Sequence, residues 1–100
     1  MQRISTKQNQ FLKGLAHKLK PVVLIGQHGL TEAVMIEIET ALEHHELIKI
    51  KVSGADRDTK SSIIHTIVEH TQSHLVQQVG HTATLYRPKQ DQTKAKIKLP

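Results

Sequence analysis

Two kinds of hydrophobic spacing alternate along this sequence, and their order restricts the folds that the chain can adopt. Apolar residues recur every three or four positions in segment 5–20 and in the segments that follow Thr31 and Asp58, which predicts three amphipathic helices. Four shorter segments are typical of strands. They are 22–25, 47–52, 75–79 and 82–87. The sequence therefore predicts an α/β fold, in the order α-β-α-β-α-β-β, with a small four-stranded mixed sheet.

Residues that begin or end helices agree with this order. Ser5 or Thr6 can cap the first helix, and Pro21 ends it. Thr31 is a suitable N-cap for the second helix, and Asp56 or Asp58 for the third. The helices are thereby separated by strand-like segments too short to be helices themselves.

The strand-like segments differ in how their two faces should be covered. In segment 47–52, apolar residues alternate with Lys49 and Lys51, which predicts one buried face and one basic, solvated face. Segment 22–25 is apolar throughout, so we expect a buried strand there. Gly80-His81 joins the last two strands, and a glycine first in a two-residue loop favours a type II′ hairpin turn.

The topology follows from connection lengths. Helical crossovers favour parallel pairing of the early strands, whereas the hairpin makes the last two antiparallel. Helices should cover at least one face of the sheet. The pattern leaves open whether the first helix shares that face with the other two.

Length and composition limit the class of protein. One hundred residues are enough for one domain, which we place at 1–88, followed by a loose basic tail at 89–100 with a weak contact through Ile97 and Leu99. The chain has no cysteine, which excludes thiolate catalysis and cysteine-bound zinc. No apolar run reaches the roughly 18 residues of a membrane span, and the first ten residues are too polar for a signal peptide. We expect a cytoplasmic protein without membrane contact.

Charge is segregated along the chain. Segment 1–20 carries five Lys or Arg and no acid, whereas segment 21–46 carries five acids and no Lys or Arg. Segment 87–100 is again basic, and the net charge is +5. This distribution predicts one basic and one acidic face, of which the basic one suits a polyanion such as a nucleic acid.

A G-x-x-G turn, Gly26-Gln27-His28-Gly29, separates the first predicted strand from the second predicted helix. A helix N-terminus can hold a phosphate with its free amides, here those of residues 29–32. The Thr31 hydroxyl could cap the helix or contact that phosphate. A plain strand-to-helix turn would explain the glycines as well. The turn lacks the G-K-[ST] of a P-loop and the third glycine of a dinucleotide fingerprint.

The eight histidines give little sign of a metal or catalytic site. His70 and His74 are four residues apart and could share a helix face, whereas His44 and His45 fall in the last helical turn, where the negative end of the helix favours them. The sequence contains no H-E-x-x-H, and no hydroxyl cluster reads as a triad. We predict no metal, no cofactor, no small-molecule substrate and no enzymatic activity.

The longer motifs are similar to a known family. The runs STKQNQFLKGLAHKLKPVVLIGQHGLTEAV, ALEHHELIKIKV, ADRDTK and LYRPK resemble, in this order, the CRM domain family (chloroplast RNA splicing and ribosome maturation), in particular its free-standing bacterial YhbY-like members. The likeness covers residues 4 to about 88. It implies a fold similar to the C-terminal domain of translation initiation factor 3. It also implies RNA binding, associated in bacteria with precursors of the large ribosomal subunit, through a loop that falls on Gly26–Gly29.

The predicted RNA-binding residues are the G-x-x-G loop with its helix cap, lysines of the first helix and its exit, the strand lysines, and two arginines. They are Gly26, Gln27, His28, Gly29, Thr31, Lys13, Lys18, Lys20, Lys49, Lys51, Arg57 and Arg87. Tyr86 is the one candidate for an exposed aromatic, so we expect recognition of RNA shape and backbone. We also expect the protein to be a monomer.

A second interpretation uses the acidic segment instead. The predicted helix there could present Glu32, Glu39, Glu43 and Glu46 to a basic partner. The protein would then be an interaction module that docks on ribosomal proteins or an assembly factor. DNA binding is disfavoured, because no segment is typical of a recognition helix.

Overall fold

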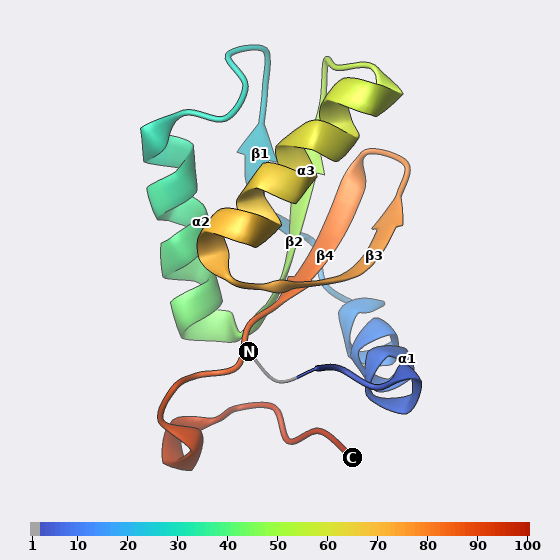
Figure 1. Cartoon of the computed structure of the whole chain (residues 1–100), viewed down its shortest axis with the longest axis vertical. Coiled ribbons are helices and arrows are strands. Elements are labelled where there is room, and N and C mark those ends of the chain that lie inside the picture. The colour runs from blue at the N-terminus through green and yellow to red at the C-terminus, as the bar shows by residue number, and fades with distance from the viewer. Residues whose placement is uncertain (1–2) are drawn as a thin grey trace.

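The structure is a computed structural model that describes residues 3–100, and it contains the predicted order of elements (Figure 1). The helices are α1 (Thr6–Ala16), α2 (Glu32–His45) and α3 (Arg57–Thr71). The strands are β1 (Pro21–Ile25), β2 (Leu47–Val52), β3 (His74–Val79) and β4 (Thr82–Tyr86), and a short 3₁₀ helix, η1 (Gln92–Lys94), follows. The predicted fold class is confirmed.

The four strands form one mixed sheet in the order β1-β2-β4-β3. β1 is parallel to β2, and β4 is antiparallel to both of its neighbours. The register slips by one residue in each edge strand, between Pro21 and Val23 and between Leu75 and Gln77. In the hairpin, Gly80 has a φ of +58° while His81 is outside the left-handed region, in agreement with a type II′ turn.

Helices α2 and α3 cover one face of the sheet. Their stripes, which include Ile38, Leu42 and Ile67, pack on Ile48 and Ile50 of β2 and bury all five side chains. Burial of each such side chain contributes about 1.5–3 kcal/mol. Both helices begin at the predicted caps: the Thr31 hydroxyl accepts the amide of Val34, and the Asp56 carboxylate accepts that of Thr59.

Helix α1 lies on the opposite face, apart from α2 and α3 (Figure 1). Leu12 and Ala16 pack on Leu47, Val76 and Tyr86, which alternate along their strands with residues of the main core. The helix ends at Ala16, before the predicted limit near residue 20. It therefore covers only part of this face.

Two sequence predictions fail because of this arrangement. β1 is buried on one face only: Val23 and Ile25 lie in the main core, but α1 does not reach across the other face, and Leu24 is 62% exposed. Tyr86 is not an exposed aromatic, because it belongs to the cluster beneath α1 and is buried. The half of the sheet face beyond α1 is left open to solvent.

The C-terminal segment is docked on the domain, contrary to the loose tail that the sequence suggests. Glu46 has 0% exposure, and its carboxylate accepts the amides of Lys89 (3.3 Å), Ile97 (3.1 Å) and Lys96. Ile97 and Leu99 pack against the cluster beneath α1, so the predicted contact is present. Glu46 therefore does not lie on an exposed acidic face, because tail amides surround it.

Candidate nucleic-acid interface

The G-x-x-G segment is a hydrogen-bonded turn. The amide of Gly29 donates to the carbonyl of Gly26 at 3.0 Å, and Gln27 and His28 at the centre have negative φ, as in a type I turn. Gly29 has a φ of +71°, which favours glycine. Gly26 is outside the left-handed region, and a methyl group added there would meet no atom within 4 Å. The fold thus favours glycine at position 29 but not at position 26.

Fewer amides are available at the start of α2 than the sequence predicts. The Gly29 amide is used within the turn, and the hydroxyl and the carbonyl of Thr31 accept the amides of Val34 and Met35. The amides of Glu32 and Ala33 open the helix and have no acceptor within it. The exposed carboxylate of Glu32 lies in the same first turn and weakens the positive potential there.

Three connections lie at the same end of the sheet, where β1 and β2 finish and β4 begins (Figure 1). The amide of Ser53, which follows β2, donates to the carbonyl of Ile25 at 3.0 Å, and that of Val52 donates to His81 in the hairpin at 2.8 Å. A methyl group at Gly54 would lie 3.8 Å from Cγ of Gln27. The connection that holds the turn is therefore hydrogen-bonded to the one that follows β2 and lies close to it.

This convergence adds two residues that the sequence analysis missed. Lys60 of α3 places its Nζ 3.1 Å from Nδ1 of His81 and 3.5 Å from the carbonyl of Gly80. Of the residues predicted to bind RNA, Arg57 is exposed in the first turn of α3, and Lys51 is exposed near the end of β2. Lys60 and His81 are 21 residues apart and carry no shared motif, so only the topology brings them together.

A basic groove runs between α1 and the open half of the sheet, with a volume of about 350 Å³. Lys13 on α1 and Lys49 on β2 both line it, and His17 was not predicted. Predicted Lys18 and Lys20 are exposed in the connection that leads into β1. That strand spans about 16 Å at ~3.3 Å per residue, which separates these two lysines from the G-x-x-G turn.

Arg87 is placed away from the other predicted cations. Its guanidinium lies 2.7 Å from the carboxylate of Glu39 and 3.5 Å from that of Glu43, and it donates to the carbonyl of Thr71 at 3.1 Å. Its side chain is 19% exposed. These contacts join the end of β4 to α2 and α3, and they neutralise part of the acidic helix.

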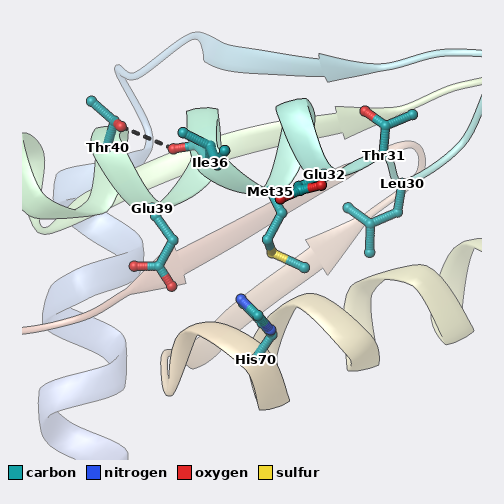
Figure 2. A pocket seen from close by; sticks show the side chains of 8 residues that line it. All are labelled: Leu30, Thr31, Glu32, Met35, Ile36, Glu39, Thr40 and His70. Carbon is teal, nitrogen blue, oxygen red and sulfur yellow. Dashed lines mark hydrogen bonds between the residues drawn. The ribbon is translucent and has the colours of Figure 1, made fainter.

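A second groove lies between α2 and α3, close to the G-x-x-G turn, and has a volume of about 450 Å³ (Figure 2). Leu30, Met35 and Ile36 give it apolar walls, and Glu32 and Glu39 make it acidic. The remaining lining residues are Thr31, Thr40 and His70. Its charge is opposite to that of the α1 groove, so the two sides of the molecule suit different ligands.

The histidines are dispersed. His70 faces α2, whereas His74 begins β3 and lies 2.8 Å from Oδ1 of Asn9, so the predicted common helix face is wrong. His44 and His45 do lie in the last turn of α2. Within residues 3–100, no three His, Asp or Glu side chains are grouped to hold a metal ion, and no helix is long and apolar enough to cross a membrane.

One known protein family matches nearly the whole chain. Residues 4–87 match the model of the CRS1/YhbY (CRM) domain. The chain belongs to the CRM domain family. The match takes in α1, the G-x-x-G turn and all four strands. The likeness seen in the sequence runs is thereby confirmed.

Relatives of this CRM domain protein are named for RNA binding. An RNA-binding protein of Haemophilus influenzae is 60% identical over 100 residues, which is 100% of this chain and 98% of the relative. The probable RNA-binding protein YqeI of Bacillus subtilis is 34% identical over 97% of this chain and 99% of its own length. A Staphylococcus aureus protein solved in solution, described as a candidate for RNA binding, has a TM-score of 0.81 at 35% identity, over 98% of this chain and 100% of its own.

Proposed function

We propose that this protein binds structured RNA through the G-x-x-G turn, the cations at the same end of the sheet and those on the α1 side. Membership of the CRM family and the names of its relatives support RNA as the ligand. Ribosomal RNA in precursors of the large subunit is the proposed target, on the strength of the likeness to YhbY-like sequences. The protein would act in the cytoplasm as a monomer, without catalysis or a cofactor.

The observation that carries this proposal is the position of Gly26. Neither its φ nor its surroundings require glycine, although it sits in a hydrogen-bonded turn at the end of the sheet. Open space at a glycine permits the close approach of another backbone. A phosphate there would reach the free amides of Glu32 and Ala33 at the N-terminus of α2.

The Coulomb attraction would come from side chains around the turn and along the sheet. Lys51, Arg57 and Lys60 lie at the end of the sheet where the turn is, and Lys49 and Lys13 continue toward the exit of α1. Neutralising about five phosphates would give a slope of about −3.5 to −4.5 for log K against log salt. Arg87 is not part of this surface, because two carboxylates already pair with it.

The test is a salt series of binding titrations with a structured ribosomal RNA fragment. Gly26→Ala should leave the free energy of unfolding within about 0.5 kcal/mol of the wild type, since the methyl group meets no atom. It should weaken binding, and Gly26→Asp should weaken it at least about tenfold through repulsion of phosphate. Gly14→Ala, at another uncrowded glycine, and Thr66→Asp, on the exposed side of α3, are the matched controls. Unchanged binding by both Gly26 variants would remove the turn from the interface.

The alternative function, docking of a basic protein on the acidic helix, has less support than the sequence suggests. Glu46 is enclosed by the tail, and Arg87 pairs with Glu39 and Glu43. Exposed Glu32 remains beside the acidic groove, and Glu37 is exposed elsewhere on α2. Reversal of these two charges would favour the alternative if it abolished particle association without affecting binding to naked RNA.

A further inference from the structure

The basic groove between α1 and the sheet is built in a way that the lysines alone do not explain. We propose that it holds the sugar–phosphate backbone of a single-stranded RNA segment and that Thr84 there contacts the ribose 2′-hydroxyl. This inference rests on the proposed RNA binding and adds the class of strand that the surface accepts.

The floor of the groove comes from three adjacent strands. Lys49 of β2 pairs with Thr84 of β4, which pairs with Gln77 of β3, so the three side chains form one row across the sheet. The register slip after Leu75 places Gln77 on the same face as buried Val76. A lysine, a hydroxyl and an amide therefore lie side by side beneath α1.

Thr84 is the unusual member of this row. It is only 5% exposed, yet its hydroxyl has no hydrogen-bond partner within residues 3–100, and its side chain lines the groove. No buried side-chain oxygen in the described chain is sealed off without a partner, so this hydroxyl keeps some contact with solvent, and the residue lines the groove. It is placed to exchange water for a hydroxyl of a ligand.

The walls supply charge of one sign. Lys13 and Lys49 line the groove with His17, no acid lines it, and neither ammonium group has a partner in the described part of the chain. An anion is therefore the complementary ligand. The volume of about 350 Å³ is at the small end of ligand sites, which suits a sugar with its phosphate and is too small for a duplex.

The chemistry of the row distinguishes RNA from DNA. A 2′-hydroxyl both donates and accepts hydrogen bonds, and it is the group by which a protein tells the two apart. The Thr84 hydroxyl and the Gln77 amide offer both roles. The lining contains no Phe, Tyr or Trp, and His17 supplies its one aromatic ring, so the groove would bind mainly the backbone and read the bases weakly.

The test compares a short oligouridylate with the deoxyuridylate of the same length, using the full chain. Wild type should bind the RNA severalfold more tightly, and Thr84→Val should weaken RNA binding about fivefold, the loss of one neutral hydrogen bond, without changing DNA binding. Thr84→Ser keeps the hydroxyl and should keep the preference. Lys49→Gln should weaken both ligands equally and reduce the salt slope by about one. Thr40→Val, in the acidic groove, is the matched control.

Two outcomes would overturn the inference: a wild type that binds both oligonucleotides equally, or a Thr84→Val variant with an unchanged RNA-to-DNA ratio. Binding of structured ribosomal RNA that still depends on Gly26 would then leave the proposed function standing. If the wild type bound neither the oligouridylate nor structured ribosomal RNA, the proposed function would be refuted as well.

Discussion

Glu46→Ala should release the C-terminal segment and destabilise the fold. The buried carboxylate accepts three backbone amides from residues 89–97, and no other acidic side chain is fully enclosed within residues 3–100. Alanine removes both acceptor oxygens, and with them all three hydrogen bonds, and leaves space beside the tail. The perturbation therefore acts on one contact that holds twelve residues in place.

The magnitude follows from how these bonds are lost. A hydrogen bond to a charged group contributes about 1.5–3 kcal/mol net. The three hydrogen bonds are lost in one step, however, and water then hydrates the freed amides. We expect the free energy of unfolding to fall by about 2–4 kcal/mol, well below the sum of three separate bonds. Glu46 also has a φ of +63°, which costs an L-residue about 1–2 kcal/mol. Glu46→Gly relieves that strain and should be less harmful than Glu46→Ala by about 1 kcal/mol.

Urea denaturation of four proteins measures this effect: the wild type and Glu46→Ala, each with the full chain and with the chain cut after Pro88. If the carboxylate acts by holding the tail, Glu46→Ala should cost far less in the shortened chain. Hydrogen exchange at the amides of Lys96 and Ile97 should accelerate in full-length Glu46→Ala. An equal loss of stability in both backgrounds would refute the reasoning, since the carboxylate would then act on the domain itself.

Three further predictions concern Arg87, Tyr86 and His74. Arg87→Met should lower the free energy of unfolding by about 1–3 kcal/mol in urea titrations and leave RNA affinity unchanged, because its bonds to Glu39 and Thr71 are structural. Burial, and next the charge of Glu46, raise the pKa of Tyr86 above 10.0, so its stabilising effect is complete below pH 10 and is lost as pH rises through the folded value. As the sole tyrosine in a chain without tryptophan, it can be followed by phenolate absorbance, and Glu46→Ala should lower its midpoint. Burial lowers the pKa of His74 below 6.5, so stability should fall as pH drops through the folded value, and His74→Gln should flatten that slope in urea titrations at each pH.

Local patterns were enough to predict the elements. Ser5, Thr31 and Asp56 cap the helices as their positions suggest, and the alternation around Lys49 and Lys51 gives β2 its buried and basic faces. These features depend on residues a few positions apart. The likeness to the C-terminal domain of translation initiation factor 3 stays a prediction, as do the RNA-binding roles of individual residues.

Long-range contacts explain the failures. The sequence suggests that Glu46 is one more acidic residue of a helix, but its hydrogen-bond partners lie 43 to 51 residues further along the chain. Arg87 reads as a free cation, yet Glu39 is 48 residues away in sequence and 2.7 Å away in space. The four apolar residues of 22–25 suggest a doubly covered strand, and only the short reach of α1 leaves Leu24 exposed.

The register slips in β1 and β3 have a consequence for how copies of this protein meet. Both strands lie at the edges of the sheet, where free backbone groups could recruit a strand from another molecule. Each edge is interrupted by an extra residue, and β1 begins with Pro21, which has no amide hydrogen to donate. A strand from another molecule could therefore not form an uninterrupted row of hydrogen bonds with either edge. We therefore expect the two edges to disfavour strand pairing between copies, although the sheet face between them is open and partly apolar.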